Sequence, residues 1–367
     1  MRATGRVAAS LAALAVVTAA CAQAPTPGLS TTSAGTVAVD TAPSTSAAVA
    51  TFVEVDRRVT ASTALATATE EGVELCGVPI DRIADGTGPR TEVGTTGMLR
   101  AGNAPTGVRL RRDEVVLSDG AVLSDVMIPD GSMLRVEPGA AVTIERITAD
   151  DAWVFMEEGA TLTMRDSDIR RPLSADNWYV LDGHGDGGLL EFNRFSGGEA
   201  ATIFLRSESS NWTIRNNDVS GGEDGFKPGG SGHVIESNWI HDLATGTKLS
   251  SGGARHSDGL QLQGANIDLS IRCNFIDSTV DGANAAIIIK PDLGDIATVE
   301  VVENAMAGGA YTLFSIVAGT DYPMTDVKIG GNVFFAGTGY YGSIALDNDA
   351  TVLADNVTEN AEPVTAG

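Results

Sequence analysis

Short apolar segments separated by turns dominate the chain from about Val108 onward. Each segment has three to five apolar residues and is followed by an acidic residue or a Gly. Two examples are residues 115–117 before Asp119-Gly120 and residues 126–128 before Asp130-Gly131. These segments are too short and too often interrupted for helices. The pattern therefore predicts many short β-strands.

A second pattern, Ile/Val-x-x-Asn-x-apolar, recurs through the same region. Its asparagines, with a looser copy at each end, are Asn193, Asn217, Asn238, Asn274, Asn304, Asn332 and Asn356. They are 21 to 36 residues apart, and a period of this size indicates a solenoid, a propeller or an array. A propeller blade needs four strands in ~40–45 residues, whereas three short strands with their turns fit the observed spacing.

We therefore predict an all-β fold in which the chain winds as a coil of three short strands. Each strand would pair in parallel with the equivalent strand one coil away, and the inward side chains would form apolar columns. Asn suits a fixed turn position because it tolerates left-handed backbone angles. Its amide can also bond to the Asn of the coils above and below.

The Asn phrases and the Asp-Gly-apolar turns resemble the right-handed parallel β-helix repeat family, the pectate-lyase-like superfamily of secreted polysaccharide-active proteins. The resemblance extends from about Val108 to Val357 and implies a right-handed parallel β-helix of about ten coils. Left-handed helices of hexapeptide repeats are the nearest relative, but their strict period is missing here. A β-sandwich also has short strands and Gly turns, so it stays open as an alternative.

Residues 1–21 have the layout of a secretory signal peptide. Arg2 and Arg6 precede an apolar stretch that is too short to span a bilayer comfortably and ends in small residues. The run Thr-Ala-Ala-Cys at 18–21 resembles a bacterial lipobox, in which Cys21 would be lipidated after cleavage. Thr18 departs from the usual aliphatic residue, so plain cleavage nearby is the alternative. We expect an extracellular protein, either secreted or held at the cell surface through a lipid on Cys21.

Composition divides the rest of the chain into four parts. Residues 22–50 are almost all Ala, Thr, Ser, Pro and Gly and should form a flexible linker. Residues 51–106 lack the repeat and contain one predicted helix over 60–71. They are expected to form an N-terminal cap with leading coils, and a small independent domain is the alternative. The β-helix is expected over 107–358, followed by a frayed C-terminal tail over 359–367.

The charge balance excludes two classes of partner. With 24 basic and 48 acidic residues the formal net charge is −24, whereas nucleic acids and anionic membranes are bound by basic surfaces. We therefore expect no nucleic-acid partner and no membrane contact except through the lipid. Three Cys residues are too few for a disulfide scaffold or a zinc array. We expect a monomer.

The densest polar cluster, from Asp224 to Lys290, indicates where a site would lie. The interval of 36 residues between Asn238 and Asn274 is about 12 longer than a normal coil requires. The extra residues, roughly 244–255, should form a surface loop, and loops on a rigid solenoid commonly wall a groove. His256 directly follows this loop, which places the candidate groove beside it.

Asp224 and Asp258 share an Asp-Gly-apolar phrase, which would place them at the same turn of successive coils. Their carboxylates would then lie about 5 Å apart, as the acid and nucleophile of a retaining glycosidase do. The pair could equally share a cation such as Ca²⁺, although no cofactor or metal ligand set can be assigned with certainty. Asp before Gly is also an ordinary turn pair, so turn formation alone is a further alternative.

Basic side chains of the same region would suit lyase chemistry on uronate sugars. Such a reaction needs a base to remove the proton α to a carboxylate and a cation to hold the developing charge. His256, Lys227 and Lys290 are the candidates. Each could instead be an ordinary turn or strand-end residue, because both lysines precede Pro and the histidine lies in a turn.

Three further residues are candidates for substrate binding. Arg255 and Gln261 lie in the same polar run as the aspartates, and Trp239 offers a ring that could stack on a sugar face. His233 and His241 flank the neighbouring coil without metal-ligand spacing, and we interpret them as structural.

One short motif carries a resemblance to a specific enzyme family. His256-Ser257-Asp258-Gly259 is similar to the Asn-Thr-Asp-Gly turn of polygalacturonases, which would imply a catalytic role for Asp258. That family's Asp-Asp pair, Gly-His-Gly and Arg-Ile-Lys are absent after this point. Also missing are the Asp-Pro-His-Glu motif of mannuronan epimerases and the Arg-x-Pro-x-x-Arg motif of pectate lyases. The resemblance is therefore to the fold, and no complete motif assigns a reaction.

Two cysteines, Cys76 and Cys273, remain after export. Cys273 directly precedes Asn274, and a buried free thiol is expected there rather than a bridge to Cys76.

Two functions remain open on these grounds. The first is an exported β-helix that binds and cleaves an extracellular polysaccharide by lyase or hydrolase chemistry. The second is a non-catalytic surface or adhesion solenoid, which needs only the repeat. A groove with His256, Asp258 and a lysine within hydrogen-bond reach would favour the first, and scattered side chains would favour the second.

Overall fold

The computed structural model describes residues 70, 72–174, 178–245, 255–335 and 339–366. These residues belong to one compact unit, Val55–Gly367. The signal peptide, Cys21, the linker and nearly all of the helix expected over 60–71 lie outside the described residues. Within them, no helix is both long enough and apolar enough to cross a membrane.

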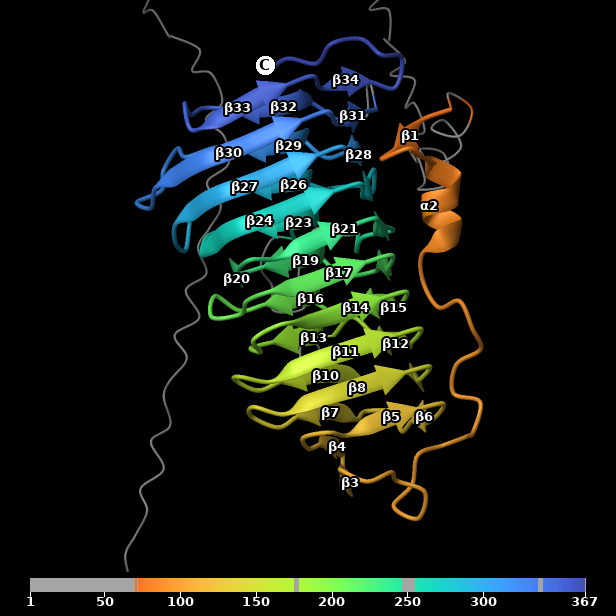
Figure 1. Cartoon of the computed structure of the whole chain (residues 1–367). Coiled ribbons are helices and arrows are strands. Elements are labelled where there is room, and N and C mark those ends of the chain that lie inside the picture. The colour runs from red at the N-terminus through yellow and green to blue at the C-terminus, as the bar shows by residue number, and fades with distance from the viewer. Residues whose placement is uncertain (1–69, 71, 175–177, 246–254, 336–338, 367) are drawn as a thin grey trace, which may run out of the picture. The chain divides into compact units, whose positions relative to one another are not determined.

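Three stacked sheets build the fold, and each coil contributes one short strand to each sheet (Figure 1). The first sheet contains β3 (Val108–Arg111), β4 (Glu114–Leu117), β7 (Met133–Val136), β10 (Trp153–Met156), β13 (Tyr179–Gly183), β16 (Ala201–Leu205), β19 (Asp224–Pro228), β23 (Asp258–Leu262), β26 (Ala285–Ile289), β29 (Tyr311–Ser315) and β32 (Gly342–Leu346).

The second sheet contains β5 (Val122–Ser124), β8 (Ala141–Glu145), β11 (Thr161–Arg165), β14 (Gly188–Glu191), β17 (Trp212–Arg215), β20 (Gly230–Ser231), β21 (Val234–Glu236), β24 (Asn266–Arg272), β27 (Ile296–Val302), β30 (Met324–Gly330) and β33 (Thr351–Ala354). The third sheet contains β6 (Met127–Ile128), β9 (Thr148–Ala149), β12 (Asp168–Arg171), β15 (Arg194–Gly197), β18 (Asp218–Ser220), β22 (Trp239–His241), β25 (Phe275–Ser278), β28 (Ala305–Gly308), β31 (Val333–Phe334) and β34 (Val357–Thr358).

All pairings within these sheets are parallel except that of β3 with β4. The ten strands of the third sheet correspond to ten coils in the described residues. The chain passes from the second sheet to the third and then to the first as it rises toward β34 (Figure 1), the right-handed sense in which parallel strands are nearly always connected. The predicted all-β, right-handed parallel β-helix of about ten coils is therefore confirmed.

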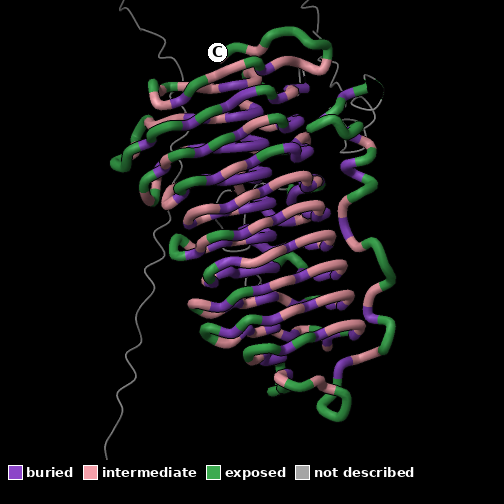
Figure 2. Tube along the Cα trace, in the orientation of Figure 1, coloured by how far each residue is buried: buried purple, intermediate pink, exposed green. Residues whose placement is uncertain are grey.

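Apolar side chains from the three sheets fill the interior of the stack. In the first sheet, one inward column runs through Val154, Leu181, Ile203, Phe226 and Leu260, all at most 1% exposed. Figure 2 shows buried segments, in purple, in the successive coils of the stack. The sequence pattern predicts this core because one side of every short strand must face the same interior.

The predicted asparagine ladder is present between the second and third sheets. The Asn274 side chain donates to Asn304 Oδ1 at 2.9 Å and to the Ile235 carbonyl at 2.9 Å. Its own Oδ1 accepts from the Asn238 backbone N–H at 3.0 Å. One expectation was wrong in detail, because the left-handed backbone belongs to the residue before each Asn, such as Cys273 with φ 57°. Asn is needed at this position for its amide rather than for its backbone angles.

The segment before the coils has two parts. β1 (Glu74–Leu75), β2 (Val78–Pro79) and α2 (Ile80–Gly86), with the extended chain after them, lie along the outside of the third sheet (Figure 1). Backbone bonds hold this chain there, among them Gly88 N–H to Asn216 O at 3.1 Å and Gly94 N–H to Arg146 O at 2.9 Å. Farther on, Leu99 is buried in the main core. The expected N-terminal cap thus covers the first coil only with its last residues and otherwise lies along the stack.

The C-terminal residues were expected to be a frayed tail, and the structure differs. Val364 donates its N–H to the Asn356 carbonyl at 2.9 Å, and Val357 forms an antiparallel bridge with Pro363. Val364 and Ala366 pack against the core. The last residues fold back because the apolar columns of the final coil would otherwise be exposed to water.

The expectation of a free thiol at Cys273 was wrong. Cys76 and Cys273 form a disulfide that joins residues 197 positions apart. Cys273 occupies the turn before Asn274, where the left-handed backbone directs its side chain away from the core. The bridge fastens the α2 segment beside an apolar cluster that includes Ile80, Ile83 and Phe275.

We expect Cys76→Ser to weaken the attachment of this segment and leave the coil intact. Removing such a bridge should lower the free energy of unfolding by about 2–4 kcal/mol. Limited proteolysis should then cut within residues 72–97 before it cuts the β-helix. Reduction of the wild-type protein should have the same effect, and equal protease resistance with and without the bridge would contradict the expectation.

Candidate functional site

The predicted alignment of Asp224 and Asp258 is confirmed. They are the first residues of β19 and β23, and the pairing of Phe226 with Leu260 aligns them on successive coils of the first sheet. The Asp258 backbone N–H donates to Asp224 Oδ1 at 2.8 Å. Both side chains are buried, with 1% and 0% exposure. The stack thus brings together two carboxyl groups that are 34 residues apart in the sequence.

Neutral and cationic donors surround the two carboxyl groups. Lys227 Nζ lies 2.8 Å from Asp224 Oδ2. Gln261 Nε2 donates to Asp258 Oδ2 at 3.2 Å, and Asn284 Nδ2 donates to Asp258 Oδ1 at 3.0 Å. The Lys227 side chain is 22% exposed, and Asn284 is half-buried, so these two residues of the cluster reach solvent. Gln261 Oε1 is buried and has no hydrogen-bond partner among the described residues.

Burial and proximity disfavour a negative charge on both carboxyl groups of the pair at once. Burial and the charge of Asp224 raise the pKa of Asp258 well above its usual range. Burial also raises the pKa of Asp224, although the charge of Lys227 opposes this rise. For Lys227, burial is outweighed by the charge of Asp224, so its pKa is raised and the ammonium persists. Asp258 is therefore the carboxyl group that is harder to ionise, and Asp224 is the one paired with a cation.

Glu223 is a member of the cluster that sequence reasoning missed. It is 5% exposed, and its Oε1 accepts the His256 backbone N–H at 2.9 Å. Burial, followed by the charge of Asp224, raises the pKa of Glu223 to about 7. The signal in the sequence was two adjacent acidic residues at a repeat turn. This carboxyl group positions the segment that carries His256 and Asp258.

Two further candidates, Arg255 and His256, lie on the segment just before Asp258. His256 lies two residues before Asp258, and its backbone N–H donates to Glu223 Oε1 at 2.9 Å. The Arg255 side chain is 6% exposed and lies 3.5 Å from Glu199, while its Nε and Nη1 have no hydrogen-bond partner in the described part of the chain. Most of the predicted loop at 244–255 lies outside the described residues.

Two predicted site residues lie elsewhere. Lys290 follows the last residue of β26, whereas Asp258 is the first residue of β23, so the length of a strand separates them. Lys290 Nζ instead lies 2.9 Å from Asp292. Trp239 belongs to the third sheet and packs against the cluster beside α2. Alternation did place Trp239 outside the core, but the outside of this sheet is covered by the N-terminal segment. Neither residue is in contact with the carboxyl pair.

The Ca²⁺ alternative requires oxygen atoms that are free to bind a cation. Asp224 Oδ2 is paired with the Lys227 ammonium at 2.8 Å, and the other three oxygens of Asp224 and Asp258 accept from Gln261, Asn284 and a backbone N–H. Among the described residues, ligand atoms of three or more metal-binding side chains gather only at Cys76, Cys273 and Glu303. The two cysteines there form the disulfide. We therefore assign no cation to the carboxyl pair.

His241 has the structural role expected for it. Its Nε2 lies 2.9 Å from Asp218 and its Nδ1 2.8 Å from Asp242, and its ring stacks on Trp239 at 3.7 Å. Burial would lower the pKa of His241, but the bonds to Asp218 and Asp242 outweigh it and raise the pKa to about 9. Arg194 also contacts Asp218 at 2.8 Å, so the whole group is an ion-pair network on the third sheet.

This network predicts a loss of stability at alkaline pH. A folded pKa near 9 against an ordinary value near 6.5 means that the stabilisation is complete below about pH 6.5 and is lost as the pH rises to about 9. The free energy of unfolding should fall by about 2–3 kcal/mol over this interval. In His241→Gln the fall should disappear. Denaturant titrations at pH 6, 7.5 and 9 check this, and equal slopes for both proteins would contradict it.

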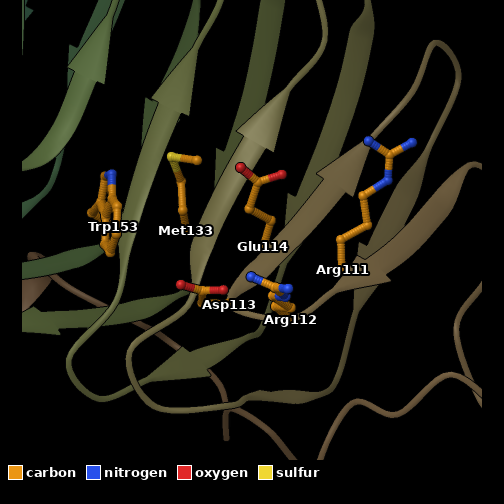
Figure 3. Close-up of a pocket in the computed structure, with 6 residues that line it drawn as sticks. All are labelled: Arg111, Arg112, Asp113, Glu114, Met133 and Trp153. Carbon is orange, nitrogen blue, oxygen red and sulfur yellow. The ribbon is translucent and has the colours of Figure 1, made fainter.

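A cavity of about 470 Å³ lies at the N-terminal end of the first sheet. Figure 3 shows Arg111, Glu114, Met133 and Trp153 side by side on neighbouring strands, with Arg112 and Asp113 at the adjoining turn. It lies three coils before β19 and contains none of the predicted site residues. The sequence pattern did not indicate it.

Comparisons with known proteins give limited information. No protein-family model matches the chain, and no curated protein matches it. Among solved structures, the chain is similar to the A-module of mannuronan C-5 epimerase AlgE4 from Azotobacter vinelandii, with 14% identity over 76% of this chain and 88% of that one and a TM-score of 0.44. It is also similar to the A-module of AlgE6 from the same organism, with 11% identity over 67% of this chain and 88% of that one and a TM-score of 0.34.

Proposed function

We propose that the protein is exported and hydrolyses glycosidic bonds of an extracellular polysaccharide, with Asp224 and Asp258 as the reacting carboxyl groups. One observation carries the proposal: two carboxyl groups begin neighbouring strands of the first sheet, with Lys227 Nζ 2.8 Å from Asp224 and with the pKa of Asp258 raised by burial and by the charge of Asp224. Glycoside hydrolases usually use two carboxyl groups whose surroundings give them different pKa values, so that one acts as an acid and the other as a carboxylate.

The roles follow from the protonation states. Asp258 donates its proton to the glycosidic oxygen, which leaves as a hydroxyl group, while the Asp224 carboxylate attacks the anomeric carbon. Water then attacks the glycosyl ester, gives one proton back to Asp258 and releases Asp224 as a carboxylate. Neighbouring strands are ~4.8 Å apart, close to the ~5–5.5 Å between carboxyl groups in retaining enzymes. Lys227 lies 2.8 Å from Asp224 and favours its carboxylate form, and the unpaired Gln261 Oε1 can accept a sugar hydroxyl.

The charge of the protein favours a neutral polysaccharide. The formal net charge is −24, which would repel a polyuronate at long range. Lyase chemistry is the alternative: Lys227, whose pKa Asp224 raises, would supply the cation rather than the base, and His256 would have to be the base.

A non-catalytic glycan-binding solenoid is the second candidate. The complete burial of Asp258, with donors on both carboxyl oxygens, favours it, since such a network would also stabilise the stack without any reaction.

The two candidates differ in their products. The purified protein should be incubated with neutral glycans (xyloglucan, glucomannan, arabinan) and acidic ones (polygalacturonate, alginate), with new reducing ends and unsaturated uronates read together. New reducing ends from a neutral glycan without unsaturated uronates are expected. Unsaturated uronates would show a lyase and contradict the proposal, and binding without product would favour the second candidate.

A further inference from the structure

The first residues of six consecutive strands of the first sheet form a symmetric row. In order along the stack they are Tyr179, Ala201, Asp224, Asp258, Ala285 and Tyr311. An aromatic residue thus stands at each end, a small residue follows, and the two acids lie at the centre. With ~4.8 Å between strands the row spans about 24 Å. The carboxyl pair lies midway between two aromatic residues.

Each terminal tyrosine belongs to a larger aromatic cluster. On the N-terminal side, the Tyr179 ring stacks on the Phe204 ring with 4.5 Å between their centroids. The Trp178 ring centroid lies 6.5 Å from that of Tyr179. The Arg206 guanidinium lies 4.5 Å from the centre of the Phe204 ring and donates two hydrogen bonds to Asp182, at 2.9 and 2.8 Å. This ion pair holds the Arg206 side chain in place against the N-terminal aromatic cluster.

The C-terminal cluster is more exposed. Tyr311 lies 5.3 Å from Phe314 and 5.7 Å from Tyr341, and Tyr341 lies 4.6 Å from Tyr340. Tyr340 and Tyr341 are 70% and 68% exposed. Their backbone N–H groups donate to the Gly309 and Ala310 carbonyls at 2.9 and 2.7 Å. The rings are therefore presented to solvent from an ordered backbone.

This concentration of aromatic side chains is not what packing alone would produce. The chain has five tyrosines, and four of them lie in these two clusters, while Tyr322 lies outside. Exposed aromatic rings leave apolar surface in water, and their grouping commonly marks a binding surface. Two apolar clusters separated by Lys227 and the carboxyl pair suit a ligand with apolar faces and polar edges. A chain of sugars has this character, whereas a protein interface would favour one continuous apolar patch.

We propose that the two aromatic clusters are sugar-binding platforms that hold one glycan chain along the row, on both sides of the carboxyl pair. The location of the cut rests on the hydrolysis proposed above, whereas the binding does not. A chain held on both sides is cut at internal bonds, so the protein acts as an endo-hydrolase. Short oligosaccharides that reach only one platform bind weakly.

Binding is tested with the full chain carrying Asp258→Asn, so that bound glycan is not consumed. Affinity electrophoresis in gels containing xyloglucan, glucomannan or arabinan measures Kd. For whichever glycan the protein binds, Trp178→Ala and Tyr341→Ala, each in this background, should raise Kd roughly 5–10-fold. In the double variant the two fold-increases in Kd should multiply. The matched control is Tyr322→Ala, an exposed tyrosine outside both clusters that is expected to leave Kd unchanged. In the chain with Asp258 intact, the first products should be long fragments rather than mono- or disaccharides.

The outcomes separate this proposal from the hydrolysis. If the glycan binds and the Trp178 and Tyr341 variants behave as Tyr322→Ala does, the platforms are overturned whether or not the chain hydrolyses glycans. If these variants weaken binding and wild-type protein releases no reducing ends, the platforms stand and the hydrolysis falls. If no glycan of the panel is retained, both fall. If sedimentation velocity shows a dimer that Tyr341→Ala dissociates, the C-terminal cluster is an interface between copies and the proposal is overturned.

Discussion

Replacing Asp258 by Asn is expected to lower turnover of the cleaved glycan by a factor of about 10³. Asp258 is the group whose pKa burial and the charge of Asp224 raise well above its usual range, which suits it to the role of the acid. An amide in its place cannot transfer a proton to the departing oxygen, although it fills the same volume. The kcat should therefore fall, while the Kd for the glycan should change little because the aromatic clusters remain.

The substitution also perturbs packing, and a control must separate the two effects. Gln261 and Asn284 both donate to Asp258, so the new amide nitrogen meets one of these donors. We expect a loss of stability of about 1–3 kcal/mol. Asp277 is the matched control, because it is also buried with a raised pKa but belongs to β25 on the third sheet. Asp277→Asn should lower the melting temperature with kcat unchanged. Equal kcat in wild type and Asp258→Asn would remove Asp258 from the chemistry.

The sequence predicted the fold because the repeat records it directly. A parallel coil places equivalent residues over one another, so the spacing of Asn217, Asn238 and Asn274 encodes a column. The alignment of Asp224 with Asp258 follows from the same logic, although their spacing of 34 residues differs from that of most coils. Short recurring sequence patterns thus predicted the contacts between coils, which join residues far apart in the sequence.

Other parts of the site could not be predicted in this way. A coil has three outer faces, and the repeat does not state which face a residue such as Trp239 or Lys290 reaches or what covers it. Tyr179 and Tyr311 belong to no shared phrase, so the aromatic row becomes visible only when the strands are aligned. The Cys76–Cys273 bridge depends on the course of residues 72–97, which follow no repeat.

The second large effect is expected from Asn274→Leu, which should lower the free energy of unfolding by about 2–6 kcal/mol. The Asn274 amide donates to the carbonyls of Ile235 and Arg272 and to Asn304 Oδ1, and its oxygen accepts from the backbone and the side chain of Asn238. Leu fits the space but satisfies none of these groups. A buried donor or acceptor left without a partner costs about 1–3 kcal/mol, and at least two are left here.

The same substitution at Asn360 provides the control, since Asn360 is exposed near the C-terminus and its Nδ2 has one bond of 3.5 Å to Glu359. Asn360→Leu should change stability by less than about 0.5 kcal/mol. Urea titrations followed by circular dichroism measure both variants. Because each coil contacts mainly its neighbours, the loss in Asn274→Leu should also broaden the transition as the coils on either side unfold separately. An unfolding curve identical to that of the wild type would mean that the asparagine amides do not hold the coils together.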